Sequence, residues 1–285
     1  MNPPPDPDEQ RSASRDMWEQ AAAGWNKRAD RVRDWGMPVS VTMVDALALQ
    51  PGQRVLELAA GPGDTGFMAA ELVLPGGTLI SSDGADAMVA VARERAAAAG
   101  ITNVEFRQLE LEWIDLEAAS VDAVLCRWGI MLIVDPGAAA REIRRVLRPS
   151  GRAAFAVWDR AERNPWATIP GRALVELGHA EPPDPNAPGM FTLGDEGVLA
   201  DLLESAGFTE VTIRPVAVER HYEELDRYIE ETVDMSPIFS ATFKELSAEA
   251  QDEVLARVTA GARPFVGADG SVMLPGSSLV AVATA

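Results

Sequence analysis

The chain has few of the residues that build disulfides and metal sites. Among its 285 residues are one cysteine, Cys126, and two histidines, His179 and His221, which lie far apart in the sequence. A single cysteine excludes an intramolecular disulfide and a multi-cysteine metal centre, and two separated histidines argue against a histidine-rich one. We therefore expect no metal site and a structural role for Cys126.

Basic residues and long apolar runs are also scarce. The chain carries 25 Lys and Arg against 44 Asp and Glu, a formal net charge of −19. Binding of nucleic acid needs stripes of Lys and Arg that the sequence lacks, so we expect no nucleic-acid partner. No apolar run approaches the ~20 residues that span a membrane, and the acidic, proline-rich start lacks the apolar stretch of a secretory signal. These features predict a cytoplasmic protein with a disordered tail over residues 1–13.

Apolar residues make up 47% of the chain, and their pattern switches between strand-like runs and helical spacing. Such alternation is typical of a parallel α/β sheet. Two helices, over residues 14–35 and 38–49, are expected before the first strand. Seven strands are expected over residues 54–59, 78–82, 104–108, 123–126, 153–158, 209–218 and 277–285.

The same pattern divides the chain into a core and later additions. Residues 14–158 are expected to form a cofactor-binding core that includes the N-terminal helices. Residues 159–194 are rich in Pro and Trp and lack a clean period, which indicates an inserted lid. Residues 195–285 complete the sheet and carry inserted, mostly helical residues over 223–262.

One glycine-rich stretch is typical of a nucleotide-binding loop. An apolar strand containing Glu57 breaks at Gly61, Gly63 and Gly66 and is followed by a helical pattern. Gly61 and Gly63 allow positive φ and a close approach by a ligand, and the N–H groups of the helix N-terminus face the same crevice. By spacing alone the glycines also fit a dinucleotide fingerprint, so an NAD(P)-dependent oxidoreductase remains an alternative.

The pattern Glu57-x-x-x-Gly61-x-Gly63 resembles the first motif of class I S-adenosylmethionine-dependent methyltransferases. Residues 122–131 resemble the fourth motif of the small-molecule members that act in ubiquinone and menaquinone biosynthesis. The resemblance implies an α/β fold with a Rossmann-like, seven-stranded, mostly parallel sheet, helices on both faces, and the seventh strand between the fifth and sixth. It implies S-adenosyl-L-methionine as the cofactor, with Glu57 beside its methionyl end. Alternatively, Glu57 only organises the glycine loop through hydrogen bonds.

Further cofactor contacts are expected after the second and third strands. Asp83 ends the second strand, where a carboxylate can accept both hydroxyls of a ribose. The resemblance implies that Met88 packs on the adenine face, and that Glu110 and Leu111 contact the adenine edge. Glu112 is the alternative to Glu110.

The resemblance also places Arg127 where it would touch the cofactor's carboxylate or the substrate. Trp25, with Trp18, either lines the site or packs in the core. The reaction implied is in-line methyl transfer to a small, partly apolar molecule, which requires a base only if the acceptor holds its proton. His221 is the leading candidate base and His179 the second. A scaffold that binds S-adenosylmethionine without catalysis is a further alternative; the acceptor and the oligomeric state are not predicted.

Overall fold

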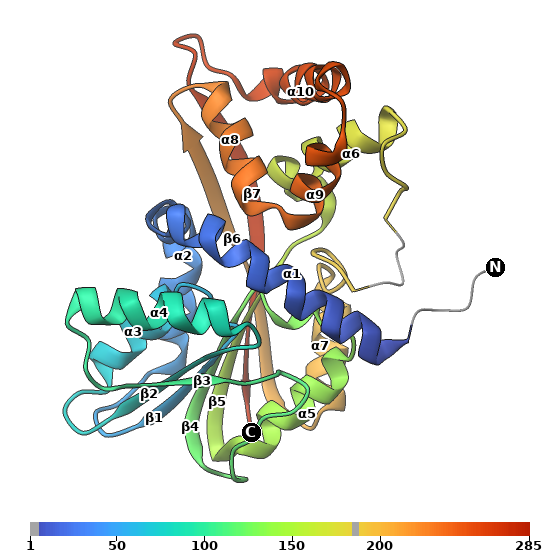
Figure 1. Cartoon of the computed structure of the whole chain (residues 1–285). Helices are drawn as coiled ribbons and strands as arrows, with labels where there is room; N and C mark the ends of the chain where they lie inside the picture. Colours follow the sequence, from blue (N-terminus) through green and yellow to red (C-terminus); the bar gives the residue numbers. More distant parts are fainter. Residues whose placement is uncertain (1–5, 184–187) are drawn as a thin grey trace.

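A computed structural model describes residues 6–183 and 188–285 and is built on one seven-stranded sheet (Figure 1). The strand order is β3-β2-β1-β4-β5-β7-β6. Neighbours pair in parallel from β3 to β5, whereas β7 runs antiparallel to both β5 and β6. This order confirms the predicted Rossmann-like sheet with the seventh strand between the fifth and sixth. The strands are β1 (Arg54–Leu58), β2 (Thr78–Asp83), β3 (Val104–Gln108), β4 (Val121–Arg127), β5 (Leu147–Trp158), β6 (Thr209–Tyr222) and β7 (Val272–Thr284).

Helices cover both faces of the sheet and bury its apolar strands. On one face α2, α3 and α4 pack against the strands, and on the other α5 and α7 pack against β5, β6 and β7 (Figure 1). Leu279–Ala283 of β7 is buried throughout, as expected of a central strand covered on both sides. The helices are α1 (Pro7–Lys27), α2 (Ala29–Leu47), α3 (Asp64–Leu72), α4 (Asp86–Ala99), α5 (Pro136–Val146), α6 (Pro165–Glu176), α7 (Glu196–Ser205), α8 (Leu225–Met235), α9 (Pro237–Glu245) and α10 (Ala248–Ala262).

The predicted disordered tail is wrong from Pro7 onward, because α1 begins there. The Asp6 carboxylate accepts a hydrogen bond from the backbone N–H of Asp8 at 2.8 Å, and a proline suits the first helical position. Residues 1–5 of the predicted tail lie outside the described residues. The strength of this N-terminal cap explains why an acidic, proline-rich stretch starts a helix.

The break between the two N-terminal helices was also misplaced, since it falls at Arg28 and Pro38 lies inside α2. Pro38 is exposed, while Val32, Trp35 and Val39 form a continuous buried face on either side of it. Packing of that face against the sheet outweighs the helical hydrogen bond that proline removes.

The segment predicted as an irregular lid contains an ordered helix. Pro165 starts α6, and Trp166, Ala173 and Leu174 bury one side of it. This helix packs against α10 and β7. Residues 184–187 of the predicted lid lie outside the described residues, and a lid function for residues 159–194 stays a prediction.

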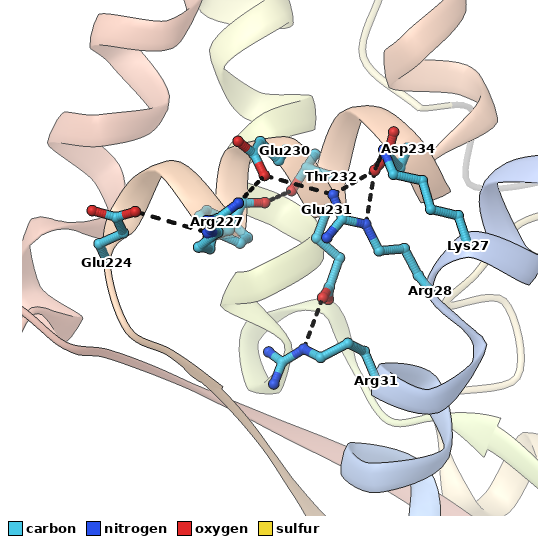
Figure 2. Close-up of polar contacts among 10 residues, drawn as sticks. Lys27, Arg28, Arg31, Glu224, Arg227, Glu230, Glu231, Thr232 and Asp234 are labelled. Atoms are coloured by element: carbon cyan, nitrogen blue, oxygen red, sulfur yellow. Dashed lines mark hydrogen bonds and ion pairs between the residues drawn. The ribbon is translucent and has the colours of Figure 1, made fainter.

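Helix α1 crosses the molecule between α4 of the core and the C-terminal helix α8 (Figure 1). At its C-terminal end, Lys27 Nζ and Arg28 Nη2 contact Asp234 Oδ2 of α8 at 2.9 and 2.6 Å (Figure 2). A Cβ on Gly24 would lie 2.2 Å from the Asp234 carbonyl oxygen, so the close approach of the two helices requires glycine there. The C-terminal helices thus fix the position in which α1 lies across the core.

Candidate active site

A cleft opens at the carboxyl ends of β1, β2, β3 and β4, beneath α1. The empty space in it is about 980 Å³ when the open mouth is included. Seven of the predicted cofactor residues line it, from four strand ends and α1: Trp25, Gly61, Asp83, Met88, Glu110, Leu111 and Arg127. Glu57, Gly63 and His221 do not line it.

The glycine loop after β1 presents its backbone to this cleft. Ala59, Gly61 and Gly63 all have positive φ, of 50°, 51° and 89°. A Cβ on Gly61 would meet no atom within 4 Å, so the backbone there faces open space. A Cβ on Gly66 would lie 2.1 Å from Glu57 Oε2, so the first turn of α3 sits directly on that carboxylate.

Glu57 lies beneath the loop and is only 3% exposed. Its Oε1 accepts a hydrogen bond from the Gly66 N–H at 2.7 Å, and its Oε2 accepts one from the Ser81 hydroxyl at 3.4 Å. Burial raises the pKa of Glu57 to about 8, although the Gly66 N–H and the Arg127 charge oppose the rise. This geometry supports the alternative in which Glu57 organises the glycine loop rather than contacting the cofactor.

The raised pKa predicts that Glu57 destabilises the fold as pH rises. Its pKa is about 8 in the folded chain against an ordinary value of 4.5, so the native state binds more protons between these limits. The free energy of unfolding then falls with rising pH, by up to about 1.4 kcal/mol per pH unit from this group. We expect Glu57→Gln, which keeps an acceptor for Gly66, to gain stability relative to the wild type between pH 5.5 and 7.5.

Urea unfolding of both proteins at these two pH values measures the effect. Glu71→Gln is the matched control, because Glu71 is an exposed acid on α3, the helix whose first turn packs on Glu57. If the free energies of unfolding of the wild type and of Glu57→Gln changed equally with pH, this would contradict the raised pKa of Glu57.

Asp83 connects the loop to the start of α4. Its Oδ2 accepts from the Gly61 N–H at 2.9 Å and its Oδ1 from the Ala85 N–H at 3.0 Å. Burial raises the pKa of Asp83, and the nearby Glu110 and Glu19 charges add to the rise, while the two backbone N–H groups oppose it. Each carboxylate oxygen has two lone pairs, so both oxygens retain capacity for a further donor in the cleft.

The two acids after β3 differ in how much of their carboxylate is free. Both oxygens of Glu112 accept hydrogen bonds: Arg11 donates to each of them at 2.9 Å, and the Asp135 N–H donates to Oε1 at 2.8 Å. Glu110 receives Arg15 on Oε1 alone, through Nε at 2.8 Å and Nη2 at 2.6 Å. Glu110 rather than Glu112 therefore has an oxygen available to a ligand.

Apolar side chains form the walls beside these acids. Met88 is 2% exposed and packs in a small cluster with Ala22, Ala85, Trp18 and Trp25. The rings of Trp18 and Trp25 meet edge to face at 5.8 Å. Trp25 therefore both packs and lines the cleft, which combines the two alternatives expected from the sequence.

Arg127 ends β4 with an incomplete set of hydrogen bonds. Its Nη1 is buried and has no hydrogen-bond partner among residues 6–183 and 188–285, and its guanidinium carbon lies 4.4 Å from the centroid of the Trp128 ring. Burial lowers the pKa of Arg127, against the opposing charges of Glu57 and Asp64. A Cβ on Gly36 of α2 would lie 2.5 Å from Nη1, so a glycine makes room for this guanidinium. The cleft thus contains a cation that can receive an anionic group.

His221, predicted as the leading candidate base, does not line this cleft. Its side chain is 65% exposed, and its Nε2 lies 3.1 Å from Glu219 Oε2. Side chains alternate along β6, so Arg220 and Tyr222 face inward and His221 faces solvent. His179 follows α6 and does not line the cleft either. Within the described part of the chain, no group of His, Cys, Asp or Glu side chains is arranged to hold a metal ion.

Several lining residues were missed by the sequence reasoning. They come from α1 and from the segment after β4: Arg11, Ser14, Arg15, Leu132, Ile133 and Val134. The signal for the first group was present, because positions 11, 15, 18, 22 and 25 follow helical spacing. It was overlooked because the first of these positions fell in the expected disordered tail.

Residues 49–177 match a family model described as "Methyltransferase domain". Residues 49–177 are therefore a methyltransferase domain, similar to the class I S-adenosylmethionine-dependent methyltransferases. The chain is 30% identical over 183 residues to nocamycin O-methyltransferase of Saccharothrix syringae, an overlap of 61% of this chain and 65% of that protein. It is 31% identical over 110 residues to the ubiquinone/menaquinone biosynthesis C-methyltransferase of Cellvibrio japonicus, an overlap of 38% of this chain and 44% of that protein. The chain thus spans less than two thirds of either relative.

The fold is shared with solved structures at lower sequence identity. The YcgJ protein from Bacillus subtilis superposes with a TM-score of 0.56 and 18% identity, covering 86% of this chain and 97% of that one. A structural similarity at 18% sequence identity shows that the two proteins share a fold, and it shows the fold alone. Across residues 6–183 and 188–285, no helix has the length and apolar character needed to cross a membrane.

S-adenosyl-L-methionine is the cofactor of this methyltransferase family, and the cleft residues fit it. Asp83 has acceptor capacity for the ribose, and among the residues that the structure describes Glu110 Oε2 and Arg127 Nη1 have no hydrogen-bond partner. Gly61 leaves open space in which a ligand can approach the backbone. The groups of the cofactor therefore find complementary partners along one cleft.

Proposed function

We propose that this methyltransferase transfers a methyl group from S-adenosyl-L-methionine to a small, partly apolar molecule. The observation that carries the proposal is the arrangement of partners along the cleft. Asp83, which can accept from the ribose, ends β2, and the incompletely bonded Arg127 ends β4, on the other side of β1. The glycine loop presents open backbone at Gly61 between them.

Each lining residue has a role in holding the cofactor. Asp83 accepts the ribose hydroxyls, Met88 and Leu111 contact the adenine, and Glu110 accepts from its amino group. Arg127 pairs with the carboxylate of the methionyl end, because charge-assisted bonds to arginine suit that group. Glu57 and Gly63 act indirectly, through the shape of the loop and the start of α3.

The chain promotes the reaction mainly by alignment. When bound, S-adenosyl-L-methionine supplies a methyl group that is already activated by its sulfonium. Residues of the cleft hold the two reactants in line, and α1 covers the cleft and excludes water. Histidine is absent from the described residues that line the cleft, so a protein base is not required by this account.

A cluster of buried tryptophans next to Arg127 supports a partly apolar acceptor. Trp128 lines the cleft, stacks on Trp158 at 4.4 Å and lies 5.2 Å from Trp35. Arg220 closes the far side, with its guanidinium carbon 3.9 Å from the Trp35 ring and 3.4 Å from the Trp166 ring. Aromatic faces of this kind bind flat or apolar molecules. We further propose a cytoplasmic location and no nucleic-acid partner, which the net charge of −19 supports.

The proposal is tested first by titrating the chain with S-adenosylhomocysteine in a calorimeter. We expect a dissociation constant on the order of 1–100 μM, in the usual range for enzyme ligands. Methyl transfer is then measured with a panel of small acceptors that carry hydroxyl, amine, thiol or activated carbon groups. No binding at millimolar ligand would overturn the proposal. Binding without transfer to any acceptor would favour the non-catalytic scaffold, and a fluorescence response to NADH alone would favour the oxidoreductase.

A further inference from the structure

Helix α1 brings two arginines, one turn apart, onto the two acids that follow β3. Arg11 holds both oxygens of Glu112 at 2.9 Å. Arg15 places Nε and Nη2 on a single oxygen of Glu110, Oε1, at 2.8 and 2.6 Å. Of these two arginine–glutamate pairs, only Arg15–Glu110 leaves one carboxylate oxygen without a hydrogen bond from the described residues.

The free oxygen of Glu110 faces the cofactor cleft. A Cβ on Gly84 would lie 3.2 Å from Oε2 and 3.8 Å from Oε1, so Oε2 is the oxygen nearer to Gly84. Gly84 lines the cleft between Asp83 and Ala85. In the described parts of the chain, Oε2 receives no hydrogen bond. The oxygen is therefore directed beside the ribose-binding carboxylate.

Glu110 needs such a restraint because its side chain is flexible and 46% exposed. A glutamate loses about 1.5–2 kcal/mol of rotamer freedom when it is fixed in one conformation. Contact of one oxygen with two nitrogens of a planar guanidinium restricts the carboxylate before any ligand binds. Preorganisation of this kind lowers the cost of binding.

We propose that Arg15 is a positioning residue for recognition of the cofactor's adenine. It holds Glu110 by Oε1 so that Oε2 accepts a hydrogen bond from the exocyclic amino group. This inference rests on the proposed function, in which Glu110 faces the adenine. It predicts that Arg15, which need not touch the cofactor, contributes to the preference for an amino group at that position of the purine.

The preference is measured by comparing two ligands that differ at the 6-position of the purine, where a carbonyl replaces the amino group and N1 gains a proton. S-adenosylhomocysteine carries an amino donor at the purine, and S-inosylhomocysteine carries an oxygen acceptor that opposes Glu110. We expect the wild type to bind the adenosyl ligand at least ~10-fold more tightly, because the acceptor would leave a carboxylate oxygen unpaired. In Arg15→Met we expect this ratio to fall to about 3 or less, mainly through weaker binding of the adenosyl ligand.

Three further variants sharpen the test. Arg15→Lys retains the charge without the planar fork and should restore part of the ratio. Glu110→Gln should lower the ratio, and adding Arg15→Met to it should lower the ratio no further. Arg33→Met, which removes an exposed arginine of α2 that pairs with Asp30 and Asp34, should leave the ratio unchanged.

Each outcome decides between named alternatives. If Arg15→Met keeps the wild-type ratio of the two affinities, or loses the same affinity for both ligands, the positioning role is overturned. An equal loss is the result expected if α1 served only to cover the cleft. Folding of each variant is checked by circular dichroism, and if Arg15→Met fails to fold, the Arg15→Lys ratio decides. Failure of the wild type to bind either ligand overturns the proposed function and this inference together, whereas wild-type binding with an unchanged Arg15→Met ratio overturns this inference alone.

Discussion

Replacing Asp83 with alanine is expected to reduce the affinity for S-adenosylhomocysteine by on the order of 100-fold or more. Two hydrogen bonds from the ribose to a charged acceptor are lost, at about 1.5–3 kcal/mol each. The same carboxylate also holds the backbone N–H groups of Gly61 and Ala85, at 2.9 and 3.0 Å. Loss of these anchors loosens the glycine loop, so the effect on binding should exceed that of the ribose contacts alone. Calorimetric titration measures it.

The control for this prediction lies three residues away. Asp86 stands in the first turn of α4, is exposed and does not line the cleft. Asp86→Ala should therefore bind S-adenosylhomocysteine within about 2-fold of the wild type, as expected of a surface substitution. Equal affinities of Asp83→Ala and wild type, with both proteins folded by circular dichroism, would remove Asp83 from the cofactor site.

Replacing Gly66 with alanine should damage both the fold and the site. A Cβ there would lie 2.1 Å from Glu57 Oε2 and 3.0 Å from Leu79 Cδ2, and all three residues are buried. Glu57 cannot withdraw without breaking its 2.7 Å bond to the Gly66 N–H. Overpacking of this kind costs about 1–3 kcal/mol, and an unsatisfied buried carboxylate adds to it. We expect a lower free energy of unfolding in urea and a loss of cofactor binding.

A second glycine provides the matched control. Gly171 lies within α6, is exposed, and would place a new Cβ at least 4 Å from other atoms. Alanine in a helix interior is favoured over glycine by about 0.5–1 kcal/mol, so Gly171→Ala should be neutral or slightly stabilising. If Gly66→Ala and Gly171→Ala changed the free energy of unfolding equally, the close packing of α3 on Glu57 would not explain the effect of Gly66→Ala.

The sheet and the strand-end site were predictable because both leave local signals. Seven apolar runs separated by helical spacing gave the strands, and Gly61 and Asp83 lie where strands must end at one edge. The predicted strand ends moved outward mainly in β5, which begins at Leu147, and in β6 and β7, whose hairpin continues to Tyr222 and from Val272. In the hairpin extensions, buried and exposed residues alternate without a matching alternation of apolar and polar types, so a short apolar run gives only the centre of such a strand.

The remaining features depend on contacts that have no local signature. Helix α1 was cut short because proline and acidic residues are typical of disorder, whereas here Asp6 caps the helix and Arg11 and Arg15 fix it to the core. His221 was favoured on its chemistry alone, but strand alternation turns it to solvent. Glu57 was placed beside the cofactor, although the same spacing sets it under Gly66.

The most direct test of the central claim is a crystal structure of the chain with S-adenosylhomocysteine. The account predicts that the ribose hydroxyls lie within hydrogen-bond distance of the Asp83 carboxylate. It also predicts the adenine between Met88 and Leu111, and the methionyl carboxylate on Arg127. A ligand bound outside the cleft beneath α1, or one whose ribose does not contact Asp83, would contradict it.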